Sequence, residues 1–322
     1  MMRRIPLWTT LIPLLLAIGL YAFFWRGWAD EFGAAVTASL PVGDVSVTGF
    51  PYRLETELVA PRWQAGDGVK IVASAARALV NRGPWQRELT VIRAEYPRFS
   101  AVVGPGFGAS FTGRTASTSI NVVDGRLARL STVVEAAKAR LGFTPVAIIA
   151  DRLELHVRER DPGAASEESA TLPPRGQLVV NGERLRLGGG DALTLLADMT
   201  ANGRTRLTDF DAWANYGTIE VSALTLADAH GEVAKLVATV VPVGRTGLRF
   251  AGTIETVCPQ TVVAAFEGTV PAMEMRLRAP VRLAFDGPAG AIRLSGVPAD
   301  LAARARRRQD PACPVIRSRG EI

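Results

Sequence analysis

The sequence between residues 115 and 134 reads Thr115-Ala-Ser-Thr-Ser-Ile-Asn-Val-Val-Asp-Gly-Arg-Leu-Ala-Arg-Leu-Ser-Thr-Val-Val134. Asp124-Gly125 stands at its centre, and this dipeptide favours the type I′ turn, whose twist matches that of two antiparallel strands. Thr, Val and Ile, which suit strands, recur in the flanking runs. The stretch therefore predicts a β-hairpin and makes β structure the expectation for the chain around it.

The chain before this hairpin carries more strand-like runs. In residues 52–59, Leu54 and Leu58 share an apolar face, while Glu55 and Glu57 share a polar one. A period of two predicts a strand with one buried face and one hydrated face. Similar runs occur further on, so residues 30–160 form the first predicted β-rich region; the runs lie at 69–75, 88–94, 98–103 and 145–159.

The chain after the hairpin divides at residues 161–176, where Pro, Gly, Ser and Glu predict a solvated loop or linker. Residues 177–297 form the second predicted β-rich region, and Asn181-Gly182 predicts another hairpin turn within it. Its later part predicts a meander, and residues 298–322 form an Arg-rich tail. The meander strands are expected at 218–226, 232–242 and 246–256, and covering helices at 205–214 and 258–266.

Residues 1–29 predict a membrane anchor. No charged residue falls between Arg4 and Arg26, and the 21 residues of Ile5–Trp25 extend roughly 31 Å as a helix, about the thickness of a bilayer's hydrocarbon core. Tyr, Phe and Trp residues at 21–28 are typical of an interfacial aromatic belt. The sequence therefore predicts one transmembrane helix, which residues 30–40 extend as a juxtamembrane helix.

The charges beside the anchor predict its orientation. Arg3 and Arg4 precede the apolar run, whereas Arg26 is soon followed by two acidic residues, so the positive-inside rule places the N-terminus in the cytoplasm and the bulk of the chain outside it. A cleaved signal peptide is the alternative. Its nearest acceptable cleavage site, before Ser39, lies well past the apolar core, which favours an uncleaved anchor.

Composition indicates a globular chain and argues weakly about partners. The chain is 48% apolar, with 31 Gly and 20 Pro, so it can fill a core and still supply many turns. A formal charge of +6 would suit nucleic acid or anionic lipid. Only three of the 37 basic residues are lysines, however, and a GC-rich genome produces such an Arg bias without selection for binding. An exported protein also seldom meets nucleic acid, so none is expected as a partner.

The two cysteines, Cys258 and Cys313, are each followed by Pro. In an oxidising compartment an isolated pair forms a disulfide more often than a metal site or a nucleophile. We therefore predict a Cys258–Cys313 bridge, with two buried free thiols as the alternative.

Residues that carry chemistry are sparse. His156 and His230 have no second His, Cys or acid at ligand spacing, so neither a metal site nor His-based catalysis is expected. Gly104–Gly108 and Gly188–Asp191 lack the patterns of phosphate-binding loops and predict turns. No cofactor and no enzyme activity are expected. The cluster at 304–308 suits either a solvated tail or contact with anionic headgroups.

A series of short motifs follows the anchor. They are Val45-Ser-Val-Thr-Gly-Phe-Pro-Tyr-Arg-Leu54, Ala60-Pro-Arg62, Tyr96-Pro-Arg-Phe99, Trp213, and Tyr216-Gly217 before Thr-Ile-Glu-Val-Ser-Ala-Leu-Thr-Leu226. This series resembles the bacterial family called domain of unknown function 2125, from about residue 44 to about 268. The resemblance implies a membrane-anchored envelope protein, with the bulk of the chain in the periplasm and the anchor in the inner membrane. The family has no assigned activity, so no functional residue is implied.

Long meander strands behind a single span also resemble AsmA-like envelope proteins, whose curled sheets shelter lipid chains. The expected fold is mainly β, with large curved antiparallel sheets or meanders and a few covering helices after one transmembrane helix. One hypothesis is that a concave sheet face binds lipid or another apolar envelope molecule. The alternative is a structural or scaffold component of an envelope complex, in which the same side chains form a filled core. The candidate groove or core residues are Leu54, Leu58, Val221, Leu224, Val237 and Val241.

Overall fold

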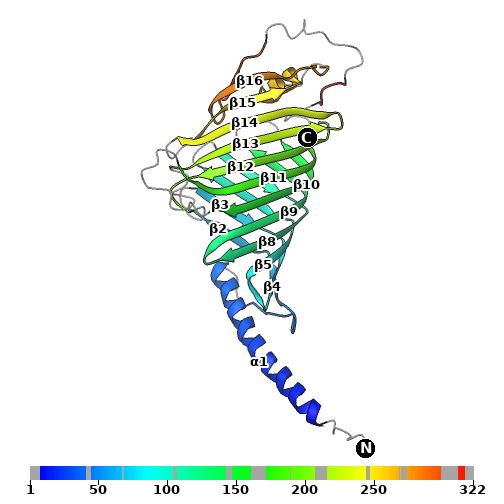
Figure 1. Ribbon diagram of the computed structural model, residues 1–322, viewed down its shortest axis with the longest axis vertical. Helices are drawn as coiled ribbons and strands as arrows, with labels where there is room; N and C mark the ends of the chain where they lie inside the picture. The colour runs from blue at the N-terminus through cyan, green and yellow to red at the C-terminus, as the bar shows by residue number, and fades with distance from the viewer. Residues whose placement is uncertain are drawn as a thin grey trace, which may run out of the picture.

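A computed structural model describes residues 8–40, 45–66, 69–103, 107–142, 147–160, 172–188, 190–206, 216–243, 247–267, 269, 274–298 and 311–315. They form two helices and one large antiparallel sheet (Figure 1), so the fold is mainly β, as predicted. The helices are α1 (Trp8–Ser39) and α3 (Pro259–Glu267). The strands are β1 (Leu54–Val59), β2 (Arg62–Ala65), β3 (Val69–Ser74), β4 (Arg77–Gly83), β5 (Gln86–Glu95), β6 (Arg98–Val103), β7 (Phe107–Thr112), β8 (Thr115–Val123), β9 (Arg126–Leu141), β10 (Ile148–Glu159), β11 (Pro174–Leu187), β12 (Leu193–Asn202), β13 (Thr218–Asp228), β14 (Gly231–Val243), β15 (Gly247–Thr256), β16 (Val281–Pro288) and β17 (Arg293–Ser295).

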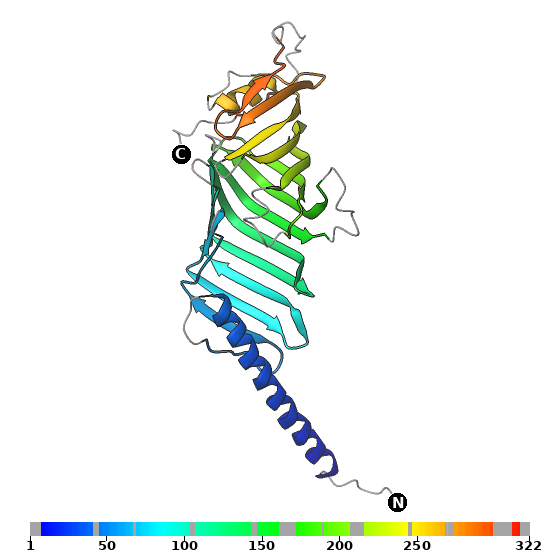
Figure 2. The same ribbon diagram turned by 90° about the vertical axis from the view of Figure 1, so that its left-hand side faces the viewer.

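The sheet is a meander that extends along the long axis of the molecule. From β8 to β17 each strand pairs with the next in the chain, and the strands lie across the long axis, with α1 leaving at one end (Figures 1 and 2). β10 pairs with β11, so strands from both predicted β-rich regions belong to one sheet. Of the linker predicted between them, residues 161–171 lie outside the described residues.

At its α1 end the sheet divides into two walls. The long strand β9 pairs with β8 through residues 126–135 and with β7 through residues 138–141, on the same edge. The first wall continues as β8, β5, β4 and β1, and the second as β7, β6, β3 and β2. Figure 1 shows the second wall behind the first. The two walls and the strands that follow them enclose a trough.

The walls meet along a line where each long strand bends once. On alternate strands the bend contains a residue with left-handed backbone: Ala60, Tyr96, Ala136 and, further along, Arg184 have φ near +50°. The pairing register does not shift across Ala60, Tyr96 or Ala136, so the chain turns there through its backbone conformation and not through an inserted residue. We call this line of bends the fold line.

Backbone pairing continues across the fold line. Ala60 N–H donates to Ala76 O at 2.9 Å, and Tyr96 N–H donates to Arg114 O at 2.8 Å. These bonds satisfy backbone groups at the bend, where they would otherwise lose a partner. Gly113 occupies a bend where a Cβ would lie 2.3 Å from Val134 Cγ1, so close approach of the walls requires glycine there.

The local predictions have mixed outcomes. The Asp124-Gly125 turn is confirmed, since both residues have positive φ between β8 and β9, and α1 continues to Ser39 as the juxtamembrane pattern indicated. The hairpin turn predicted at Asn181-Gly182 is wrong. Both residues lie inside β11, where a Cβ on Gly182 would come within 3.2 Å of Leu195 Cβ, so this glycine serves packing. The predicted helix at 205–214 falls largely outside the described residues.

Candidate functional site

One row of side chains runs along the inside of the trough through twelve strands. Residues that pair across antiparallel strands share a face, so the strand register identifies the row. None of its members is charged, and nine of the twelve are apolar. This inner row is Thr56, Val80, Ile92, Thr118, Thr132, Leu155, Val180, Ala197, Leu224, Leu236, Ile254 and Leu283.

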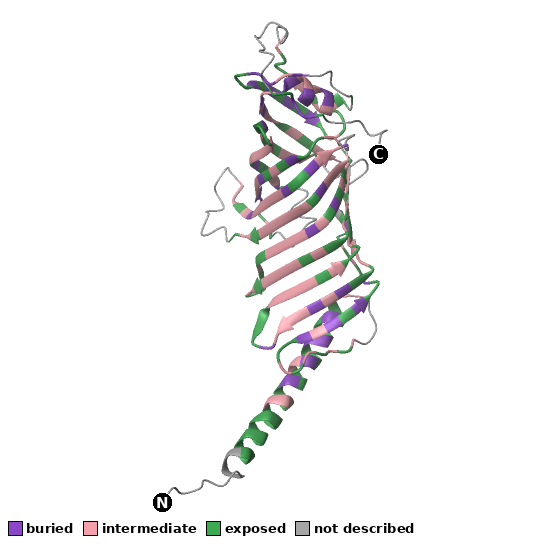
Figure 3. Ribbon diagram, turned by 90° about the vertical axis from the view of Figure 1, so that its right-hand side faces the viewer, coloured by how far each residue is buried: buried purple, intermediate pink, exposed green. Residues whose placement is uncertain are grey.

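Burial changes systematically along the inner row. Thr56 and Val80 are 1% and 6% exposed at the α1 end, and Leu283 is fully buried at the α3 end. Between them the larger side chains, such as Leu155 and Val180, are only partly buried. Figure 3 shows the same trend, with intermediate residues dominating the middle strands. The row is therefore part of a filled core at both ends and lies uncovered in the middle, although the same middle strands contribute Val134 and Leu185 to another buried cluster.

The uncovered part has the dimensions of a lipid chain. It extends from Thr118 on β8 to Val180 on β11, which is four strands in the order of pairing. Beyond it, Ile92 packs against the cluster under α1, and Leu224 packs against the cluster under α3. At ~4.8 Å per strand this distance is roughly 14 Å. One leaflet of a bilayer contributes roughly 15 Å of hydrocarbon, half of the ~30 Å core. The uncovered part is therefore about as long as an acyl chain.

The second wall adds aromatic side chains to the inside. Trp63 on β2, Phe99 on β6 and Phe111 on β7 belong to one row of cross-strand neighbours. Phe111 packs against the cluster that contains Val134 of the first wall, which places this row on the inside as well. Phe99 is 40% exposed, so it presents ring surface to whatever enters the trough.

The opposite, outer face of the sheet is polar. The residues that follow or precede the inner row on each strand include Glu57, Arg93, Glu154, Lys235 and Glu255. Cross-strand ion pairs join Glu57 to Arg77 and Glu255 to Arg282, as expected for a hydrated face. An open hollow of about 480 Å³ lies on this face, and its lining includes Arg77, Arg93 and Glu135. The sheet thus separates an apolar inside from a charged outside.

The ion pairs of the outer face keep their carboxylates ionised. Arg77 donates to Glu57 at 2.6 Å and thereby lowers the pKa of Glu57 below its ordinary value. At the other end of the sheet Arg249 donates to Asp286 at 2.5 Å and lowers the pKa of that carboxyl group. Both pairs are solvent-exposed, so they mark the wet face and contribute little to stability.

Three outer-face residues form an arrangement that sequence reasoning missed. His156 Nδ1 lies 3.0 Å from Ser131 Oγ, and its Nε2 lies 3.5 Å from Glu154 Oε2. Nucleophile, base and acid are ordered in this way in hydrolases. Here Ser131 lies in β9, whose backbone is paired on both sides by β8 and β10, so its neighbouring N–H groups are not available as an oxyanion hole. Because the serine and histidine are on different strands, their spacing in the sequence gave no signal.

The α1 end of the trough is closed by apolar packing. Residues at helical spacing on the last turns of α1 face the first wall, and Phe32 among them is 2% exposed. The guanidinium of Arg82 lies 5.3 Å from the Phe32 ring centre, and burial lowers the pKa of Arg82. The cluster is Trp25, Ala29, Phe32 and Val36 of α1 with Leu54, Leu58, Ala78 and Val80 of the sheet.

The α3 end is closed by a helix held in place by a buried carboxylate. Val262 of α3 belongs to the same cluster as Ile254 and Leu283 of the sheet. Glu274 is 2% exposed and accepts hydrogen bonds from the backbone N–H groups of Gln260 and Thr261 in the first turn of α3. A carboxylate at this position satisfies unpaired donors and complements the helix dipole.

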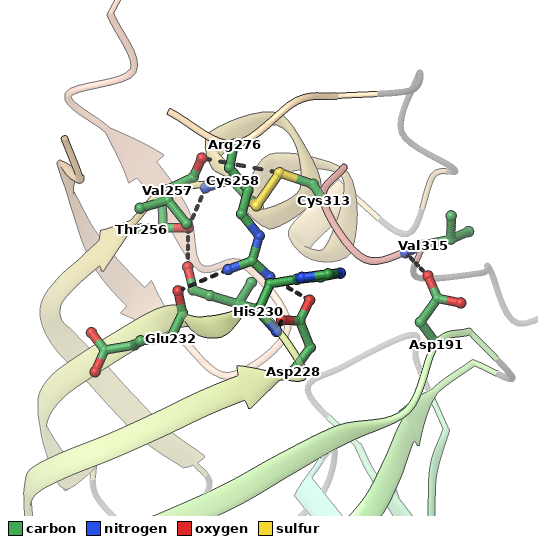
Figure 4. A network of polar contacts seen from close by, with 11 residues as sticks. Asp191, Asp228, His230, Glu232, Thr256, Val257, Cys258, Arg276, Cys313 and Val315 are labelled. Atoms are coloured by element: carbon green, nitrogen blue, oxygen red, sulfur yellow. Dashed lines mark hydrogen bonds and ion pairs between the residues drawn. A yellow bond between two sulfur atoms is a disulfide. The ribbon is translucent and has the colours of Figure 1, made fainter. Parts of the chain in front are cut away.

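A disulfide and a buried ion pair secure the same end (Figure 4). Cys258, just before α3, is bonded to Cys313, as predicted from the sequence. Arg276 is 8% exposed and pairs with Asp228 at the end of β13. Val315 N–H donates to the Asp191 carboxylate at 2.7 Å, so the segment that carries Cys313 is also tied to the start of β12.

The structure places some of the groove residues chosen from the sequence on the inner face of the sheet and others on the outer face. Leu54 and Leu58 lie inside the trough but under α1, and Val221 and Leu224 lie inside near α3. Val237 and Val241 pair with Thr253 and Arg249 and lie on the outer face, where Val237 is 46% exposed. The reason is that β14 is apolar at both alternating sets of positions, so its sequence does not reveal which set faces inward. The uncovered middle strands β8 to β11 contributed none of the chosen residues.

Three further observations bear on the class of protein. One described helix is long and apolar enough to cross a membrane, over Leu11–Ser39, and it is compatible with a single-pass anchor. Within the described ranges no group of three His, Cys, Asp or Glu side chains is placed to hold a metal ion. His230 lies in an exposed turn, with its N–H donating to Asp228. The class is therefore a β-sheet protein whose sheet has a charged outer face and whose apolar N-terminal helix closes one end of the trough.

Comparison with known families identifies the chain further. The family model described as an uncharacterised protein conserved in bacteria (DUF2125) matches residues 31–254. The chain belongs to this family. The match begins within α1 and ends in β15, so it includes both walls and the uncovered middle of the trough. No curated protein and no solved structure matches the chain, so the likeness to AsmA-like proteins has no support beyond the sequence pattern.

Proposed function

We propose that the protein holds an acyl chain of a lipid, or a similar apolar envelope molecule, in the uncovered middle of its trough. The supporting observation is the inner row, which is buried at both ends and partly exposed from Thr118 on β8 to Val180 on β11. A sheet face that served only as core would be covered along its whole length. An exposed apolar surface of this extent is a mark of a binding site in a soluble domain.

The proposed setting is the periplasmic side of a bacterial inner membrane, with α1 spanning the bilayer. The apolar length of α1 and the positive charges before it favour this orientation. The Cys258–Cys313 disulfide favours an oxidising compartment for the β domain. A reporter enzyme that is active only outside the cytoplasm, fused after residue 322, would be active in this orientation and inactive in the opposite one.

The proposed role is non-enzymatic. The Ser131–His156–Glu154 arrangement lies on the outer face, away from the apolar surface, and Arg129 also donates to Ser131 Oγ at 3.0 Å. A donor on the serine oxygen opposes its use as a nucleophile. The Ser131→Ala variant should leave the lipid content unchanged. A rate of hydrolysis of soluble esters that is higher than the rate in buffer alone, and that is lost in this variant, would contradict a non-enzymatic role.

Two adjacent valines on β11 allow a matched test of lipid binding. Val180 is in the inner row, whereas Val179 pairs with His156 and Asp198 on the outer face. A photo-crosslinking amino acid at each position in turn, in the full chain expressed in bacteria, reports what lies against each face. We expect lipid adducts at position 180 and none at 179, detected by mass spectrometry of the purified protein.

Substitution gives the second arm of the same test. Val180→Asp places a charge on the apolar surface and should remove most of the co-purifying lipid, because burying a carboxylate against an acyl chain is unfavourable. Val179→Asp adds the same charge on the hydrated face and should retain it. Equal lipid content in the two Asp variants would exclude the lipid role. Crosslinking to protein at position 179, with no lipid adduct at position 180, would also exclude it and would favour a scaffold in an envelope complex.

A further inference from the structure

Aromatic side chains from three separate segments meet beside α1. Tyr21 of α1 stacks on Trp85, from the β4–β5 hairpin, with ring centres 5.6 Å apart, and lies 5.9 Å from Phe50, in the loop before β1. Trp28 contacts both Tyr21 and Trp85, and Phe24 stacks on Trp28. We call Tyr21, Phe24, Trp28, Phe50 and Trp85 the aromatic collar.

Three rings of the aromatic collar remain exposed to solvent although they pack against other rings. Trp85 is 71% exposed, Phe24 49% and Phe50 48%, although each touches another ring. Isolated apolar side chains on a surface are ordinary, but a contiguous aromatic group indicates a surface that meets something apolar. Two members come from loops of the β domain, so this surface extends beyond the helix itself.

The position of the collar along α1 indicates what it meets. On the N-terminal side of the collar, side chains such as Leu15 and Leu16 are 64% and 68% exposed, as for a helix that lies in lipid. Tyr21 to Trp28 rises roughly 10 Å along a helix. The polar interface on each side of a bilayer, where Trp and Tyr are enriched, is roughly 5–8 Å thick. The rise from Tyr21 to Trp28 is of similar size. The loops of the β domain lie at this same level.

The collar is fixed to the β domain and cannot be adjusted independently. Tyr21 Oη donates to Pro51 O at 2.5 Å, which ties the loop to the helix. One turn further, Trp25 is buried against the sheet, so α1 and the first wall share one core. Arg87 lies over the Trp28 ring at 5.8 Å and pairs with Glu31, which adds a guanidinium at the level of lipid phosphates.

We propose that Phe50 and Trp85 insert into the headgroup region of the phospholipid bilayer that α1 spans, so that the β domain docks on the membrane surface. The α1 end of the trough then lies at the bilayer interface, and the strands extend away from it. This inference rests on α1 spanning a membrane, but it holds whether or not the trough binds lipid.

A fluorescent label tests the docking in the full chain in phospholipid vesicles. The two native cysteines are bonded to each other, so Trp85→Cys gives a single reactive thiol for an environment-sensitive fluorophore. Tyr216→Cys is the matched control, because Tyr216 is also an exposed aromatic, 75% exposed, but lies beside β13, far along the sheet from α1. We expect a headgroup-linked quencher to reduce emission from position 85 several-fold and to leave position 216 unchanged.

A third label separates the possible failures. Leu15→Cys places the fluorophore on the exposed apolar part of α1, where a quencher at the end of an acyl chain should act. Quenching at position 15 with none at position 85 would overturn the docking and leave the span intact. Absence of quenching at both positions would overturn the span and the docking together. A lipid-bound trough is measured separately by the adducts at position 180.

Discussion

The two ends of the trough are closed by different interactions. At the α1 end the cover is a helix held by apolar and aromatic contacts, in which Phe32 is the most buried side chain. At the α3 end the cover is secured by the Cys258–Cys313 disulfide, the buried Glu274 and the Arg276–Asp228 pair. Apolar contacts can be replaced by lipid, whereas a covalent bond cannot. The difference is that the end beside the proposed membrane is held by noncovalent contacts alone, whereas the far end is also held by a covalent bond.

Removing the disulfide should have the largest effect and should act at one end only. In the Cys258→Ser/Cys313→Ser variant the loop of 55 residues is no longer closed, which costs about 4 kcal/mol in the chain-entropy model. Hydrogen exchange should show lost protection in α3 and at 311–315, with β1 and β4 unchanged. Equal loss of protection at both ends would show that the ends are coupled and would contradict the comparison.

Truncating Phe32 should have a slightly smaller effect at the opposite end. Phe32→Ala leaves a cavity between α1 and the first wall and removes the ring beneath Arg82, at a cost of about 3 kcal/mol in the free energy of unfolding. Phe23, 72% exposed on the same helix, is the control, and Phe23→Ala should change stability by about 0.5 kcal/mol or less. Denaturant unfolding with hydrogen exchange distinguishes the two variants. A Phe32→Ala protein as stable as Phe23→Ala would mean that α1 is not part of the core.

Acidification should have the smallest effect and should not distinguish the ends. Glu57 and Asp286 have pKa values lowered by hydrogen bonds from Arg77 and Arg249, one pair near each end. A lowered folded-state pKa contributes stability above the ordinary carboxyl pKa, and this contribution is lost as the pH falls through the folded value. Carboxyl titration by NMR should show Arg77→Gln raising the pKa of Glu57 and Arg249→Gln raising that of Asp286. A pKa that does not move in either variant would contradict the pairing.

Local and covalent features of this fold could be predicted from the sequence. Asp124-Gly125 requires positive φ at two successive positions, and Asp and Gly accept it readily, so the turn is encoded in two residues. The disulfide was predictable because Cys258 and Cys313 are the two cysteines of a chain that the sequence predicts to be exported. Alternating faces in β1 placed Leu54 and Leu58 together because Glu55 and Glu57 mark the other face clearly.

The corner between the walls could not be predicted in the same way. The runs at 88–94 and 98–103 predicted two strands, and β5 and β6 occupy these positions. The pattern did not show that the bends at Ala60 and Tyr96 send the flanking strands into different walls. Neither residue is a glycine, so no local preference marks the left-handed backbone there. Asn181-Gly182 failed for the converse reason, since a turn signal was overridden by packing. The uncovered middle of the trough depends on what does not pack over it, and a pattern within one strand does not contain that information.

The depth and the length of the trough are set by different features of the sheet. The distance from each bend to the strand ends determines how deep the trough is, and the number of strands determines how long it is. A hairpin inserted between two middle strands, bent at the same level, would lengthen the apolar surface by roughly 10 Å without changing its depth or either closed end. Evolution or design can therefore lengthen such a trough by duplicating a two-strand unit.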